Sequence, residues 1–131
     1  MSITLANGAT TLALPDDLDW PDEYAHRPVS MAVGFTLTGR AHVESVAYVT
    51  GRTITLQADQ SSAWMTRATL DTLKTWEAVA GLVLVLTLRG VARNVMFDSR
   101  QSPGAEGRPI IFYSDPATGD YYVSTLRFLT V

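Results

Sequence analysis

Two groups of side chains in this sequence have types that could do chemistry, an acidic loop and a pair of histidines. The loop holds five acids, which are Asp16, Asp17, Asp19, Asp22 and Glu23. Carboxylates can bind a hard cation such as calcium, which takes about six to eight oxygen ligands. Their spacing does not match an EF-hand, which needs alternating acids, a glycine and a distal glutamate. We expect no metal here, and interpret the segment as a solvated loop or one that meets arginines of a neighbouring chain.

His26 and His42 are the only histidines, and we interpret neither as having a histidine or carboxylate at a ligand spacing on the same element. Both are expected at the surface. The chain has no nucleophile elbow, no dinucleotide or phosphate-binding glycine motif and no cysteine, which removes the common signatures of hydrolysis, nucleotide binding and thiolate chemistry. We therefore predict that the protein is not an enzyme, and expect no catalytic, cofactor-binding or metal-binding residue and no cofactor.

Aromatic side chains provide an alternative function, because rings on a flat sheet face can stack on sugars. The candidates are Trp20, Tyr24, Trp64, Trp76, Tyr113, Tyr121 and Tyr122. Trp76 belongs to a helical apolar stripe and is more simply explained as core. The alternative is a monomeric carbohydrate-binding β-sandwich module, and it predicts that Trp20 or Tyr122 is exposed on a flat face.

Composition limits the architecture and the partners. A chain of 131 residues with 47% hydrophobic content fits a single domain, residues 1–131, with one core. A net charge of -3 argues against a sequence-independent grip on nucleic-acid phosphates and against an anionic membrane surface, and we expect no specific nucleic-acid binding and no membrane partner. The sequence has no signal-peptide pattern and no apolar run long enough to span a membrane, so we expect a soluble, unprocessed chain. Lys74 is the only lysine beside nine arginines, a bias that favours protein interfaces but also follows from a GC-rich genome.

One segment has the periodicity of a helix, Trp64 to Gly81. Leu70, Leu73, Trp76 and Ala80 form an apolar stripe. Thr66 is the expected N-cap and Gly81 the expected residue just beyond the C-terminus. A single helix of this length is marginal in water, so it must pack on a sheet.

Nearly all the rest has the patterns of strands and turns. We predict a hairpin around Asn7-Gly8, a strand from Val29 to Leu37, a hairpin of 43–49 with 53–58, a strand at 82–88 covered on both faces and paired with 91–97, a polar loop at 98–108, a strand at 109–113 and a final strand at 121–131. The prediction is a mainly β (α+β) fold, a single antiparallel β-sandwich or split barrel of about eight strands with one flanking α-helix at about residues 66–80.

These patterns assign residues to a core and to a candidate interface. The predicted core residues are Phe35, Leu70, Leu73, Trp76, Leu84, Leu86 and Phe97. The predicted interface residues are Trp20, Tyr24, Met31, Arg100, Arg108 and Tyr122.

The order of elements resembles a known family. The loop Leu14-Pro15-Asp16-Asp17-Leu18-Asp19-Trp20, the helix that follows Ala63-Trp64-Met65, and the end segment Asp120-Tyr121-Tyr122-Val123-Ser124-Thr125-Leu126-Arg127-Phe128-Leu129-Thr130-Val131 look like parts of small tail proteins of long-tailed bacteriophages. The likeness is strongest to distal-tail or minor tail proteins, which are related to tail-tube folds. It covers most of the chain and depends on the layout and on the two end segments.

The resemblance implies a non-enzymatic virion structural protein, a ring-forming subunit near the junction of tail tube and tip. Its partners would be further copies of itself, in a ring of typically six-fold (hexameric) symmetry, and other tail proteins of the tube, the tip or hub, and the tape measure. It would be made in the host cytoplasm and located in the virion. Edge strands of neighbouring subunits could continue one sheet. The candidate contacts are residues 29–37, residues 98–108 and the two termini, and the acidic loop is a candidate for lining a lumen through which DNA passes.

Overall fold

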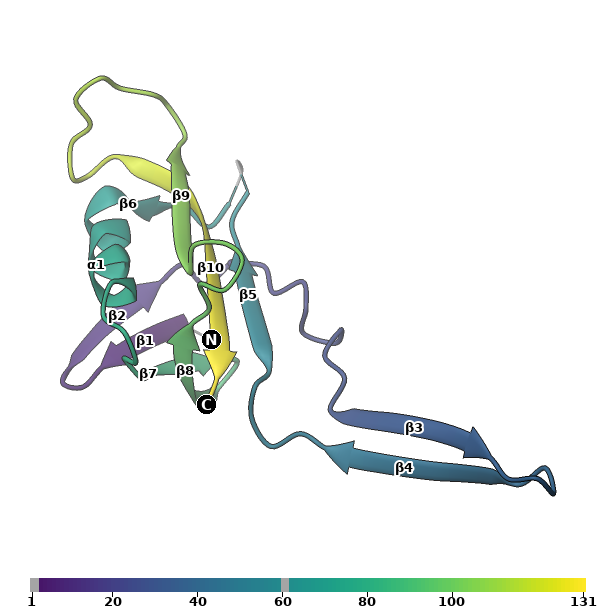
Figure 1. Cartoon of the computed structure of the whole chain (residues 1–131). Coiled ribbons are helices and arrows are strands. Elements are labelled where there is room, and N and C mark those ends of the chain that lie inside the picture. The colour runs from purple at the N-terminus through teal and green to yellow at the C-terminus, as the bar shows by residue number, and fades with distance from the viewer. Residues whose placement is uncertain (1–2, 60–61) are drawn as a thin grey trace.

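The computed structural model describes residues 3–59 and 62–131, and it has two parts, a curled body and a projecting arm (Figure 1). The body contains β1 (Ile3–Asn7), β2 (Thr10–Leu14), β5 (Thr53–Gln57), β6 (Met65–Thr66), α1 (Arg67–Glu77), β7 (Leu84–Leu88), β8 (Val91–Phe97), β9 (Ala105–Pro109) and β10 (Tyr121–Thr130). The arm consists of β3 (Val29–Phe35) and β4 (Ala41–Ala47). The predicted mainly β fold with one flanking helix is confirmed.

The body is one antiparallel sheet that curls into a half-barrel, with strand order β2-β1-β7-β8-β10-β5. The final strand, β10, holds it together, because it also pairs with β6 and β9. Its start pairs with β6 and β9, and its end pairs with β5 and β8. A ten-residue strand spans roughly 34 Å, long enough to carry two short strands on each side. The predicted final strand is confirmed as β10, but the sequence did not predict its central place in the sheet.

Two tight turns close neighbouring strands of the sheet. β1 and β2 meet around Asn7-Gly8, where Gly8 has φ +60°, and the predicted N-terminal hairpin is confirmed. β7 and β8 meet around Arg89 and Gly90, which both have positive φ. Positive φ at both central residues is the geometry that matches the right-handed twist of the flanking strands.

The core fills the inside of the half-barrel. Its fully buried members include Leu5, Leu84, Leu86 and Phe128, each 0% exposed. Of the predicted core residues, Leu70, Leu73, Trp76, Leu84 and Leu86 are buried, and Phe97 is partly buried against the same cluster. Phe97 and Phe128 pack ring to ring with centroids 5.0 Å apart. The prediction for Phe35 is wrong, because this side chain is 77% exposed on the arm.

The helix is shorter than predicted. It begins after Thr66, whose hydroxyl accepts a hydrogen bond from the N–H of Thr69, as an N-cap does. It ends at Glu77 with Ala78 as the C-cap, so Gly81 does not directly follow the helix as predicted. Ala80 lies outside the helix and is exposed. The helix packs mainly against β6, β9 and β10, so the expectation that it packs on a sheet is confirmed. No helix in the described ranges has the length and apolarity that crossing a bilayer requires.

Several predicted strand relations are wrong. β4 pairs with β3, whereas β5 pairs with β10, so 43–49 and 53–58 do not form a hairpin. The segment 82–88 is not covered on both faces, because β7 alternates and Val85 is exposed. The predicted polar loop 98–108 contains most of β9, and residues 110–113 form no strand. Local patterns predicted most strands, but long-range pairing through β10 has no local signal.

Candidate functional site

The arm is a two-stranded ribbon that points away from the body (Figure 1). The register pairs Met31 with Ser45, Val33 with Val43 and Phe35 with Ala41. Residues directly opposite one another share a face, so one face of the ribbon carries seven apolar side chains and one serine. We call it the apolar arm face, and its members are Val29, Met31, Val33, Phe35, Ala41, Val43, Ser45 and Ala47. The arm is therefore amphipathic.

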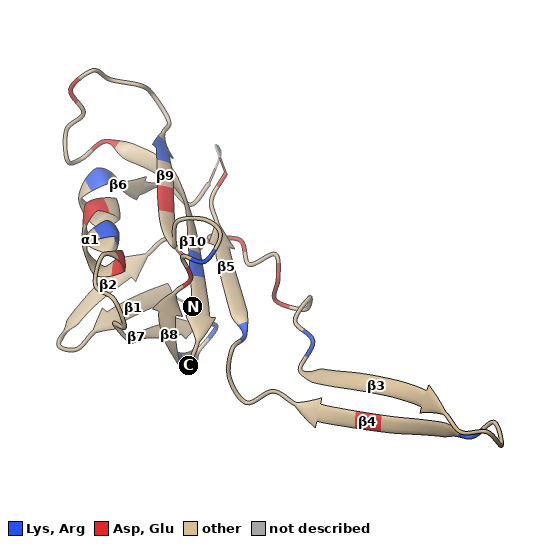
Figure 2. Ribbon diagram, viewed as in Figure 1, with Lys and Arg blue, Asp and Glu red and all other residues tan. Residues whose placement is uncertain are grey.

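The apolar arm face lies in solvent. All seven residues of β3 and all seven of β4 are exposed, including Met31 at 63% and Phe35 at 77%. Charge along the ribbon is sparse, with an acid only in β4 (Figure 2). An isolated two-stranded ribbon is at best marginally stable in water, and exposed apolar patches of this kind mark sites of interaction. The arm therefore has the composition of a buried element and the exposure of a free one.

The acidic loop closes the outer edge of β5. Asp19 exchanges backbone hydrogen bonds of 2.8 Å with Gln57, and a carboxylate oxygen of Asp22 accepts the N–H of Thr55 at 3.1 Å. Asp17 accepts the N–H of Ala63 at 3.0 Å. The backbone of Asp19 and the carboxylate of Asp22 therefore fasten the loop to the edge of β5, while Asp16, Asp17 and Asp19 are exposed, as the interpretation of a solvated loop expects.

Trp20 anchors the same loop and is surrounded by arginines. The guanidinium carbons of Arg52, Arg93 and Arg89 lie 4.8, 5.4 and 5.7 Å from its ring centroid. Arg89 also pairs with Glu23 at 3.2 Å. Burial, followed by the neighbouring charge of Arg52, lowers the pKa of Arg93. Trp20 is only 6% exposed, so its prediction as an interface residue is wrong.

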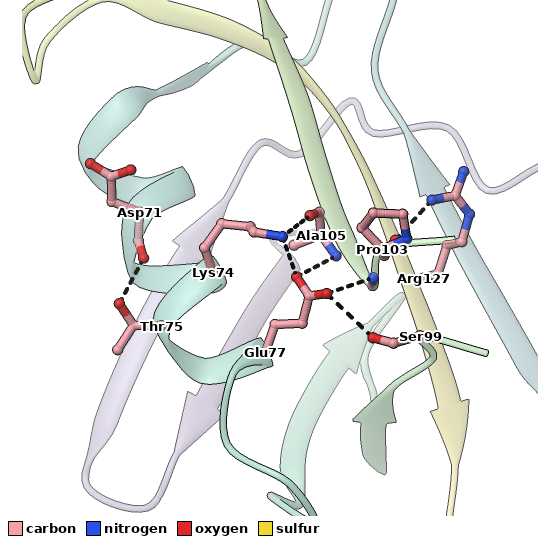
Figure 3. Close-up of polar contacts among 9 residues, drawn as sticks. Asp71, Lys74, Thr75, Glu77, Ser99, Pro103, Ala105 and Arg127 are labelled. Atoms are coloured by element: carbon pink, nitrogen blue, oxygen red, sulfur yellow. Dashed lines mark hydrogen bonds and ion pairs between the residues drawn. The ribbon is translucent and has the colours of Figure 1, made fainter. Parts of the chain in front are cut away.

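A second polar cluster fastens α1 to the start of β9 (Figure 3). The Glu77 carboxylate accepts hydrogen bonds from the N–H groups of Gly104 and Ala105 at 3.0 and 3.2 Å, from Lys74 Nζ at 2.8 Å and from the Ser99 hydroxyl at 3.3 Å. Burial opposes ionisation of Glu77, but the hydrogen bonds from Lys74, Ala105 and Gly104 and the charge of Lys74 outweigh it and lower the pKa of the carboxyl. The Glu77 carboxylate thus satisfies two backbone N–H groups at the start of β9, so the role of the cluster is structural.

One of the two histidines contacts a carboxylate. His42 Nε2 lies 3.1 Å from a carboxylate oxygen of Glu44, two residues along β4. The prediction that no carboxylate stands at strand spacing from a histidine is therefore wrong. Both side chains are about two-thirds or more exposed, at 68% and 73%, and they lie on the arm face opposite the apolar one. Among residues 3–59 and 62–131, no three His, Asp or Glu side chains converge as a metal site would require.

An aromatic cleft lies beside the 110–120 loop, at the end of the body away from the arm (Figure 1). It has a volume of about 300 Å³ and is lined by Trp64, Ile110, Ile111, Tyr113, Gly119, Asp120 and Tyr121. The rings of Trp64 and Tyr121 are 6.0 Å apart and tilted by 44°. The loop of residues 110–120, which forms one wall, also exposes Phe112 at 84%. Sequence patterns missed this cleft because the segment was expected to be a strand and a turn.

Of the predicted interface residues, some are exposed and others are buried. Tyr24 is 92% exposed, Met31 belongs to the apolar arm face, and Arg100 and Arg108 are exposed. Tyr122 is 7% exposed and its hydroxyl accepts a hydrogen bond from Arg67 at 2.6 Å. Trp20 and Tyr122 therefore do not form a flat sugar-binding platform, and their prediction as interface residues is wrong.

No protein-family model matches the chain, and a search of curated proteins gives no match.

Proposed function

We propose that this chain is a non-enzymatic structural subunit that assembles with copies of itself. Within that class, the resemblance in its sequence favours a ring-forming tail protein of a long-tailed bacteriophage, near the junction of tube and tip. One observation carries the proposal, the apolar arm face, which belongs to an arm whose fourteen strand residues are all exposed in the single chain. A neighbouring copy that covers this face would provide the packing that a two-stranded ribbon lacks.

The surface area of the chain supports the proposal. A compact monomer of 14.3 kDa has an expected accessible surface of about 6,800 Å². This chain has 8368 Å², about 1,600 Å² more than that expectation. A standard interface hides roughly 800 Å² on each partner, so the excess is close to what one subunit hides against two neighbours in a ring.

The shape of the sheet also supports self-assembly. The acidic loop closes the outer edge of β5, but β2 pairs only with β1 among the described strands. An open edge is a ready site for a further strand from another chain. An arm at one side and an open edge elsewhere are different surfaces, and contacts between different surfaces generate rings or stacks.

The test is a matched pair of substitutions on one strand. Val33 faces Val43 at the centre of the apolar arm face, whereas its neighbour Ala32 lies on the opposite face, across from Glu44. Sedimentation velocity and negative-stain images should show assemblies for the native chain and for Ala32→Lys, and monomers for Val33→Lys. A native chain that remains monomeric at high concentration would refute the proposal. Assembly of both variants alike would show that the apolar arm face is not the contact.

A further inference from the structure

We propose that the arm tip of one copy docks in the aromatic cleft of the next copy. The arm tip is residues 35–40, the end of β3 and the turn that leads to β4. This inference rests on the proposed self-assembly and names the surface that receives the arm. Both surfaces expose apolar side chains, and they lie at opposite ends of the same chain.

Geometry prevents the arm from reaching its own cleft. The arm leaves the body on the side away from the 110–120 loop, and the two lie at opposite ends of the molecule (Figure 1). A contact between them must therefore join different copies. It is heterologous, because surface A of one copy meets surface B of the next, and such a contact closes into a ring or continues as a stack.

The apolar chemistry of the two surfaces matches. Phe35 and Leu37 are 77% and 108% exposed at the arm tip, and each needs an apolar surface to leave water. The cleft offers Ile111, Tyr113 and Tyr121 around a volume of about 300 Å³. That volume is at the small end of the range for binding pockets, roughly 300–1,000 Å³, and suits a few side chains from a turn.

The charges of the two surfaces are opposite. Arg40 closes the arm-tip turn, where its N–H bonds the Thr36 hydroxyl and its carbonyl accepts the N–H of Thr36. It is the only charged residue of the tip. The segment from Pro109 to Tyr121 contains two acids, Asp115 and Asp120, and no base. Opposite charges at the rim of a contact guide its orientation and association rate.

Backbone geometry gives the arm tip a defined shape. The Thr36 N–H donates to the Arg40 carbonyl at 2.8 Å, and the Gly39 N–H donates to the Thr36 carbonyl at 3.0 Å. Gly39 has φ +85°, which favours glycine there. A turn fixed by these bonds loses less conformational entropy on docking than a loose loop would.

Cysteine cross-linking tests the contact directly, because the native chain has no cysteine. One variant carries Leu37→Cys at the arm tip and a second carries Ile111→Cys in the cleft lining. The matched control is Val83→Cys, which is 49% exposed on another part of the body. Equal amounts of the tip variant and either partner are mixed, oxidised and separated under denaturing, non-reducing conditions, while sedimentation monitors assembly.

The expected result is a tip-to-cleft dimer whose yield exceeds that of the control by about tenfold or more, since a disulfide needs Cα atoms within roughly 7 Å of each other. If assemblies form but this dimer is no more abundant than the control, the docking inference is wrong and self-assembly stands. If nothing assembles, both fail. Oligosaccharide binding by the native chain that is lost in Tyr113→Ala, without the tip-to-cleft dimer, would assign the cleft to a sugar and overturn the inference.

Discussion

Replacing Glu77 with alanine should unfold the chain at markedly lower denaturant concentration. Its carboxylate satisfies the backbone N–H groups of Gly104 and Ala105, which belong to buried residues at the start of β9. Alanine at position 77 leaves both donors without this acceptor, and it also removes the ion pair with Lys74, whose Nζ lies 2.8 Å from Glu77. The substitution therefore removes the hydrogen bonds that Glu77 accepts from the start of β9 and leaves the one from Lys74 Nζ to the Ala105 carbonyl at 3.0 Å (Figure 3).

The expected cost follows from the number of donors left unpaired. Each buried donor without a partner costs about 1–3 kcal/mol, and partial access of water to the site brings the sum for two to about 2–4 kcal/mol. The Lys74 pair adds less than about 1 kcal/mol, because Lys74 is half exposed. Glu77→Gln keeps an amide oxygen that can accept one of the two N–H groups, so about half of the loss should return.

Urea unfolding followed by tryptophan fluorescence measures these differences. Asp71→Ala is the control, because Asp71 is 63% exposed and pairs with Arg67 only at 4.0 Å; its effect should stay within about 0.5 kcal/mol. The reasoning is refuted if Glu77→Ala and Asp71→Ala unfold at the same urea concentration, or if Glu77→Gln is as unstable as Glu77→Ala.

Three further outcomes follow from the same contacts. The pKa values of Glu77 and Asp98 are lowered, that of Asp98 mainly by the hydrogen bond from Arg100. The stability that these carboxylates contribute is therefore present above the ordinary carboxyl pKa and is lost as the pH falls through the lowered values. Urea titrations at successive acidic pH values should show this decline, and a smaller decline in Glu77→Gln. Trp76→Ala should cost about 3–5 kcal/mol in the same assay, since Trp76 is 8% exposed in the core; a folded, equally stable variant that no longer assembles would instead make the helix an interface. Gly104→Ala should lower the melting temperature, because a Cβ there meets Phe97 Cβ at 2.7 Å, whereas Ala117→Ser, at an exposed turn position, should leave it unchanged.

The sequence predicts which segments form the helix and the strands better than it predicts which strands pair with one another. The Asn7-Gly8 turn, the Thr66 cap and the apolar stripe of Leu70, Leu73 and Trp76 are local features, and each appears where its pattern indicates. The pairing of β5 with β10 joins residues about seventy positions apart, and nothing in either strand specifies that register alone.

The arm shows why alternation misled the prediction of a core residue. Val29 to Leu37 alternates as a half-buried strand does, and the arm face is indeed apolar. Alternation reports that one face needs a cover, but it does not report whether the cover comes from the same chain. Alternation therefore predicts Phe35 in the core of this chain. In the structure Phe35 is 77% exposed, and in the assembly we propose a neighbouring copy covers it.

The acidic loop and the cleft were missed for different reasons. The carboxylates of Asp17 and Asp22 bond backbone groups 46 and 33 residues away, a relation that composition does not encode. The cleft is formed by the 110–120 loop, Trp64 and Tyr121, which meet only because β6 pairs with the start of β10.

Removing the arm tests the central claim most directly. The Tyr48 N–H donates to the Pro28 carbonyl at 2.8 Å, so the ends of the arm are adjacent and a short Asn-Gly turn can replace residues 29–47. Sedimentation velocity should show assemblies for the native chain and monomers for the shortened one, with an unchanged unfolding free energy because no arm strand residue is buried. A shortened chain that assembles as the native chain does would contradict the account.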